Sequence, residues 1–116
     1  MTEKQREMIT AAAGWWEMAV THTVTGRRQY SDAQAPARLR DALIASLNQE
    51  CEHHAKITDL TVDYQPVRLL EHIQVASGMH VFDFPPKTVM LIRWYNNTIV
   101  VISGANETKV YPDDLD

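Results

Sequence analysis

The sequence predicts an α+β fold, in which two N-terminal helices form an antiparallel pair and pack on a small antiparallel sheet. Two observations lead to this prediction. Apolar residues recur at helical spacing in the first half of the chain, and two β-branched runs flank an Asn-Asn pair in the second half. The sheet is expected to be built around this C-terminal β-hairpin, with a short third helix before it. The chain has 116 residues, so we expect residues 1–116 to form a single domain.

The first helix is predicted to begin with a capping box, because Thr2 is followed three residues later by Gln5. Gly26 is a natural stop for this helix. Trp15 and Trp16 lie about 100° apart on the helix, so one narrow stripe cannot cover both. Either both border a wide core seam, or Trp15 belongs to a partner-binding surface, where tryptophan is enriched. The expected inward positions are Met8, Ile9, Ala12, Ala13, Trp16, Ala19 and Val20.

The second helix is predicted to begin at Pro36, which suits the first turn of a helix, and to extend to about His54. Only the loop over residues 26–35 separates the two helices, and such a connection favours antiparallel neighbours. The apolar stripe of this helix consists of Leu39, Leu43, Ile44, Leu47 and Cys51.

The middle of the chain alternates between extended and helical patterns. Residues 57–64 predict a strand, and Pro66 is expected to open a short helix that runs from residue 67 to residue 77 and stops at Gly78. Residues 72–76 also alternate, so a strand there is the competing interpretation. Residues 79–84 predict a short strand, which ends at Pro85-Pro86 because proline does not fit a central strand.

Residues 87–103 predict the hairpin. If Asn96 and Asn97 form a two-residue turn, Tyr95 pairs with Thr98. One face then carries Met90, Ile92, Trp94, Ile99 and Val101, and the other carries Val89, Leu91, Arg93, Tyr95, Thr98, Val100 and Ile102. Both faces are mostly apolar, and the two helices can cover only one of them. A turn over residues 104–108, a short strand over residues 109–111 and an acidic tail are expected to follow.

Composition excludes several classes of function. The net charge is −4 and the acidic excess lies in the second half, so we do not expect direct binding to nucleic acid. The polar N-terminus lacks the apolar core of a signal peptide, and no apolar run is long enough to cross a membrane. The single cysteine cannot form an internal disulfide, which fits a reducing compartment. We therefore expect a cytoplasmic protein that does not bind membranes.

The residues show no catalytic motif. Cys51, His53 and His54 cluster at the end of the second helix, and a thiol nucleophile or a metal site there would need one of these histidines. Their spacing is not diagnostic of either site, and Cys51 fits the apolar stripe as a small core residue. There is no glycine-rich phosphate loop and no nucleophile elbow. We expect no catalytic residue, no metal and no cofactor.

Three short segments carry a resemblance to known proteins. They are Ala11-Ala-Ala-Gly-Trp15-Trp16, Val62-Asp-Tyr-Gln-Pro66 and Phe84-Pro-Pro-Lys-Thr88. Together they resemble a group of small phage- and prophage-encoded proteins that have an Ala-Ala-x-Trp-Trp helix, a Val-Asp-Tyr-x-Pro segment and a Phe-Pro-x-Lys-Thr entry into a strand. The resemblance implies a small accessory phage protein, of the kind that inhibits host defences such as CRISPR–Cas and restriction systems. The chain departs from the group at Arg27-Arg28, where the group tends to carry an Asp-Asn-Gly-Asp-like turn.

From these observations we expect a non-enzymatic binding protein that occludes a surface of a host defence protein in the host cytoplasm. The chain could also form a homodimer. The alternatives are a protein that sequesters a nucleotide signal through Lys87, Arg93 and nearby aromatic residues, and a thiol- or metal-dependent enzyme at Cys51. Tyr64 and Phe84 could form the walls of a small pocket with Lys87 at its rim, but the favoured interpretation is that they close the edge of the core. The candidate partner-binding residues are Trp15, Arg27, Arg28, Lys87, Leu91, Arg93, Tyr95, Val100 and Ile102.

Overall fold

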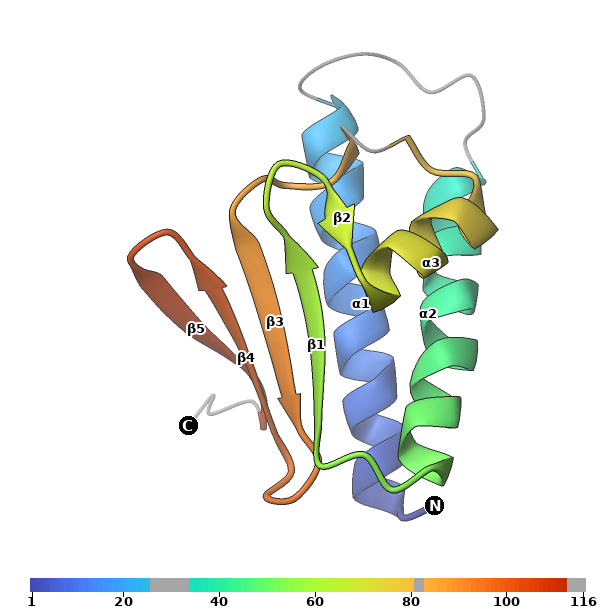
Figure 1. Ribbon diagram of the computed structural model, residues 1–116, viewed down its shortest axis with the longest axis vertical. Coiled ribbons are helices and arrows are strands. Elements are labelled where there is room, and N and C mark those ends of the chain that lie inside the picture. Colours follow the sequence, from blue (N-terminus) through green and yellow to red (C-terminus); the bar gives the residue numbers. More distant parts are fainter. Residues whose placement is uncertain (26–33, 81–82, 113–116) are drawn as a thin grey trace.

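The computed structural model describes residues 1–25 (side chains through Thr21), 34–80 and 83–112, and it has the expected α+β class. Within these residues, three α-helices lie beside one antiparallel sheet whose strands have the spatial order β2-β1-β3-β4-β5 (Figure 1). The helices are α1 (Glu3–Thr25), α2 (Ala35–Glu52) and α3 (Leu69–Ser77). The strands are β1 (Ile57–Val62), β2 (Pro66–Val67), β3 (Thr88–Arg93), β4 (Thr98–Ser103) and β5 (Asn106–Tyr111).

The capping box at the start of α1 is confirmed. The Gln5 backbone N–H donates to Thr2 Oγ1 at 3.1 Å, and the Thr2 N–H donates to Gln5 Oε1 at 2.8 Å. These bonds satisfy backbone donors that the first turn of a helix otherwise leaves unpaired. The cap fixes the start of the helix. The stripe that contains Met8, Ala12 and Trp16 faces the sheet and is fully buried.

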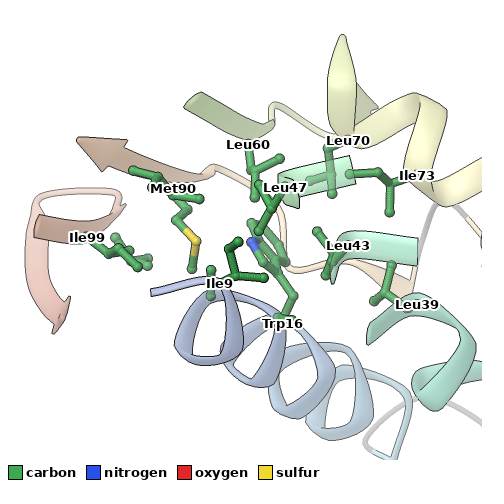
Figure 2. Close-up of a cluster of buried hydrophobic side chains, with 14 of the residues drawn as sticks. Ile9, Trp16, Leu39, Leu43, Leu47, Leu60, Leu70, Ile73, Met90 and Ile99 are labelled. Atoms are coloured by element: carbon green, nitrogen blue, oxygen red, sulfur yellow. The ribbon is translucent and has the colours of Figure 1, made fainter. Parts of the chain in front are cut away.

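α2 runs antiparallel to α1 and supplies a leucine every four residues to the core (Figure 1). Leu39, Leu43 and Leu47 are fully buried, and they converge with Trp16 of α1 and Leu60 of β1 (Figure 2). Burying a leucine side chain contributes roughly 1.5–3 kcal/mol. The helical stripes predicted from the sequence therefore meet in one core on a single side of the sheet.

The segment after β1 differs from the expectation. The predicted helix start at Pro66 is wrong, because Pro66 and Val67 form the short strand β2 and pair with Val62 and Thr61 of β1. Proline cannot donate a backbone hydrogen bond, but it is tolerated at the edge of a sheet, which is where β2 lies.

α3 begins at Leu69 and ends at Gly78, as predicted for its C-terminus, where φ is 74°. The competing strand over residues 72–76 is wrong. Leu70 and Ile73 of α3 are buried beside the leucines of α2 (Figure 2). α3 therefore lies on the same side of the sheet as α1 and α2.

The strand predicted over residues 79–84 is not formed in the described residues 79, 80, 83 and 84. The Asp83 N–H donates to the His80 carbonyl at 3.0 Å, and the Asp83 carboxylate accepts from the His80 N–H at 3.2 Å. These two bonds hold His80 and Asp83 close together, which an extended strand would not allow. Phe84 follows and is buried in the core, where its ring centroid lies 6.2 Å from that of Trp16.

The hairpin forms with a different register from the predicted one. Arg93, not Tyr95, pairs with Thr98, so residues 94–97 make a four-residue loop. The backbone N–H of Trp94 donates to the Lys56 carbonyl at 2.9 Å, so the pairing of β3 with β1 continues one residue beyond the point where the pairing of β3 with β4 ends. A shift of two residues keeps every side chain on its face, because side chains alternate with period two. The two predicted faces are therefore confirmed.

β5 is three residues longer than predicted. Gly104 and Ala105 form a two-residue turn, in which Gly104 has φ 61°, and Asn106 pairs with Ser103. The first four residues of β5 are exposed and polar, so no apolar alternation marks them as a strand. The Tyr111 hydroxyl donates to the Glu7 carboxylate of α1 at 2.7 Å, which holds the end of this edge strand against the helical layer.

Candidate binding site on the open face of the sheet

One face of the sheet has no cover from the described residues. α1, α2 and α3 all pack against the face that carries Leu60, Met90 and Ile99 (Figure 2). We call the opposite side the open face. From β1 to β5 it consists of Ile57, Asp59, Thr61, Val67, Val89, Leu91, Arg93, Thr98, Val100, Ile102, Glu107 and Lys109.

The centre of the open face is apolar. Leu91 pairs with Val100 and Val89 pairs with Ile102, so four branched side chains form a block across β3 and β4. Val100 is 8% exposed, whereas the other three are half-buried. The predicted site residues Leu91, Val100 and Ile102 are therefore brought together. They form an apolar surface of the kind found at the centre of protein interfaces.

Charged and polar side chains surround this block. Asp59 and Thr61 of β1 border one side, and Glu107 and Lys109 of β5 border the other. Arg93 lies at one end of the block beside Thr98; it is half-buried and has no ion-pair partner in the described part of the chain. A half-buried guanidinium without a carboxylate is well placed to bind an external one.

A cleft of about 720 Å³ opens at the other end of the open face. Lys87 stands at its rim, with Nζ 3.3 Å from Asp63 Oδ1 and 4.5 Å from the ring centroid of Tyr64. The hydrogen bond to Asp63 raises the pKa of Lys87, so its ammonium group is charged at neutral pH. The cleft is lined by Asp59, Thr61, Val62, Asp63, Val67, Arg68, Lys87, Val89, Ile102 and Gly104.

The backbone around the cleft is unusual. Tyr64, Arg68 and Lys87 have φ values of 141°, 54° and 55°, which residues with a side chain rarely adopt. For Arg68 the corresponding ψ is −126°, a combination that favours glycine. Such conformations each cost of order 1–3 kcal/mol and are frequent at functional sites. Among the described residues, His54 and Asn97 also have positive φ, but they lie elsewhere, after α2 and in the hairpin loop, so three of these five residues lie in or beside the cleft.

The remaining predicted site residues lie elsewhere. Trp15 is half-buried on the helical side, with its ring centroid 4.9 Å from that of Trp16, which fits the wide core seam. Tyr95 lies in the hairpin loop and is 64% exposed. Arg27 and Arg28 lie outside the described residues. Phe84 is buried in the core, so the alternative pocket near Tyr64 and Lys87 does not include it.

Asp59, Thr61, Val67 and Arg68 are members of this site that sequence reasoning did not select. Asp59 and Thr61 could have been found from their position in the same alternating strand as the core residues Leu60 and Val62. No pattern marks Arg68, because it reaches the cleft only through the pairing of β2 with β1.

The cysteine and histidine cluster does not form a recognisable active site. Cys51 is buried at the end of α2, and His53 and His54 are exposed. Burial raises the pKa of the Cys51 thiol, whereas a nucleophilic cysteine has a lowered pKa. Within the described ranges, no three histidine, cysteine, aspartate or glutamate residues are grouped so that they could hold a metal ion.

Cys51 is expected to react slowly with a disulfide reagent such as dithionitrobenzoate at pH 7. Its raised pKa keeps the thiolate fraction low, and burial restricts access. We expect a rate at least ~10-fold below that of the same protein unfolded in urea. The absorbance of the released thiolate measures both rates. A folded protein that reacts faster than the unfolded one would show that Cys51 is activated.

Comparisons with protein families, with curated proteins and with solved structures find no match to this chain. In the described residues, no helix combines the length and the apolar character that crossing a membrane requires.

Proposed function

We propose that this protein is a non-enzymatic binding protein that inhibits a host defence system, of the CRISPR–Cas or restriction type, by covering a surface of one of its proteins in the host cytoplasm. The resemblance to small phage-encoded proteins supplies the biological class. The observation that supports the binding mode is the open face, because its apolar block lacks a cover from the described chain. Apolar surface of this kind gains free energy when a partner removes it from water.

The chemistry of the partner follows from the side chains on the open face. Leu91, Val100 and Ile102 require apolar contacts, and Arg93 requires a carboxylate beside them. The partner surface should therefore present apolar residues around at least one aspartate or glutamate. Arginine is frequent among the residues that dominate interface energies, since its planar group can bind a carboxylate through two hydrogen bonds.

A second copy of the chain is the competing occupant. In a face-to-face pair with its two-fold axis along the strands, Arg93 would lie opposite the Arg93–Thr98 pair of the other copy. With the axis across the strands, Arg93 would lie opposite Val89 and Ile102. Neither arrangement supplies a carboxylate to Arg93, so a foreign partner is the better fit.

The proposed function predicts that expressing the protein restores phage plating on cells with an active defence system. Leu91→Lys and Arg93→Glu should each reduce this protection by at least ~10-fold, because the first places an ammonium group against the apolar part of the partner surface and the second places a carboxylate against its carboxylate. Met18→Lys is the matched control, since Met18 is 63% exposed on α1, on the helical side. Circular dichroism verifies that each variant is folded.

Full protection by a folded Leu91→Lys variant, across the defence systems tested, would contradict the use of the open face. Loss of protection in Met18→Lys would assign the contact to the helical side instead. A measured mass that is dimeric for the natural chain and monomeric for Leu91→Lys would show that a second copy occupies the face.

A further inference from the structure

We infer that the cleft at the Lys87 end of the open face binds a small nucleotide-sized ligand, through an anionic group on Arg68 and Lys87 and through hydroxyl or amino donors on Asp59 and Asp63. This inference goes beyond the proposed function, because the cleft occupies only one end of the open face. Its volume, about 720 Å³, lies in the range of roughly 300–1,000 Å³ that is typical of small-molecule sites.

The lining has the composition of such a site. The apolar floor consists of Val67 of β2, Val89 of β3 and Ile102 of β4, with Thr61 of β1 between Val67 and Val89. Polar groups lie around this floor, with Asp59 on β1 and Lys87 at the start of β3. Small-molecule sites commonly combine an apolar body with a few polar groups that fix the orientation of the ligand.

Two independent observations coincide at Arg68. Its guanidinium has no hydrogen-bond or ion-pair partner in the described part of the chain, although the residue lines the cleft. Its backbone, with φ 54° and ψ −126°, has a conformation that glycine adopts at lower cost. An arginine in this conformation is costly to the fold, so the side chain is better explained by a ligand than by stability.

Lys87 shares the position and the backbone conformation of Arg68, but its side chain has partners within the protein. It lines the cleft and has φ 55°, so both cationic residues of the cleft lie at positive φ. Its ammonium group is held in place by Asp63 and by the Tyr64 ring. Lys87 is therefore oriented before any ligand arrives, which lowers the entropy lost on binding.

The charges of the lining define the ligand class. Two cations suit a phosphate, which arginine can bind through two hydrogen bonds. The carboxylates of Asp59 and Asp63 only accept hydrogen bonds, so the rest of the ligand should carry donors. Thr61 already donates to Asp59, and Lys87 donates to Asp63. Each carboxylate has further acceptor capacity, and a simple inorganic anion would use neither that capacity nor the apolar floor. A nucleoside monophosphate supplies the phosphate, the sugar hydroxyls and a flat apolar body.

Isothermal titration of the full chain with AMP, GMP, CMP and UMP at up to ~1 mM tests the inference. At least one of them should bind with a stoichiometry of one, and both its nucleoside and inorganic phosphate should bind at least ~10-fold more weakly. Arg68→Gly should weaken binding at least ~10-fold without lowering the melting temperature, since glycine accepts this backbone conformation. Lys87→Ala should also weaken binding.

Arg6→Ala is the matched control, because Arg6 is an exposed arginine on α1 outside the cleft, and it should leave binding unchanged. Absence of binding by all four nucleotides overturns the inference, as does undiminished binding by Arg68→Gly. Equal affinity for inorganic phosphate would show an adventitious anion only and would also overturn it. The nucleotide test can fail independently of the proposed function. Leu91 lies outside the cleft lining, so the Leu91→Lys variant should retain nucleotide binding even where it loses protection.

Discussion

Replacing Trp16 with alanine is expected to lower the free energy of unfolding by about 3–5 kcal/mol, the loss typical of a fully buried tryptophan. Trp16 is 0% exposed and lies where α1, α2 and the sheet meet (Figure 2). Domains of this size have a total stability of about 5–15 kcal/mol, so the variant should be close to unfolding. Guanidinium denaturation followed by far-ultraviolet circular dichroism measures the change.

Trp16→Phe separates the loss of ring packing from the removal of the buried Nε1–H group. The indole Nε1 of Trp16 is buried and finds no acceptor among the described residues. An unsatisfied buried donor costs about 1–3 kcal/mol, so phenylalanine loses packing but also removes this penalty. We expect Trp16→Phe to lose at least ~2 kcal/mol less than Trp16→Ala. Alanine removes the same N–H group, so the difference between the two variants measures the packing of the ring, and equal losses would contradict that packing contribution.

Trp15→Ala is the comparison within the same helix. Trp15 is half-buried against Trp16, so less apolar surface returns to water when it is truncated. Its loss should therefore be clearly smaller than that of Trp16→Ala.

The parts of the fold that the sequence predicted have local causes. Thr2 and Gln5 form the capping box because two side chains three residues apart can each reach the backbone of the other. Gly78 ends α3 because the positive φ of a helix end suits glycine. The faces of β3 and β4 follow from the alternation of side chains, which holds whatever the turn.

The parts of the fold that the sequence did not predict depend on contacts between distant segments. The four-residue loop of the hairpin accompanies a longer pairing of β3 with β1, in which Trp94 bonds to Lys56, and no pattern within residues 87–103 records that pairing. The start of β5 is polar because it is an exposed edge strand, and such a segment resembles a loop. β2 is only two residues long, so it has too few positions to show an alternation.

The same distinction applies to the candidate site. Leu91, Arg93, Val100 and Ile102 could be assigned to one face from alternation alone, and the structure places them together. The cleft could be predicted only in part: the sequence allows a pocket beside Lys87 and Tyr64, but Arg68 lines it only after β2 pairs with β1 and after its backbone adopts a positive φ. Positions where local preference and structure disagree are frequent at functional sites, which is why the cleft merits direct testing.

Trp94→Ala is expected to lower the free energy of unfolding by about 3–5 kcal/mol. Trp94 is 6% exposed, and its Nε1–H donates to Thr58 Oγ1 at 2.8 Å. The Thr58 hydroxyl in turn donates to Glu50 Oε1 at 3.1 Å, so the chain of bonds joins the hairpin loop, β1 and α2. Removing the indole loses buried surface and the bond that holds the loop against β1.

A double-mutant cycle isolates the hydrogen bond from the packing. Trp94→Phe and Thr58→Val each leave one buried polar group without its partner, whereas the double variant removes both groups. The double variant should therefore lose less stability than the sum of the single losses, by about 1 kcal/mol. Denaturation of the four proteins under the same conditions gives this coupling energy. Additive losses would mean that the bond contributes nothing, and that packing alone holds the Trp94 side chain.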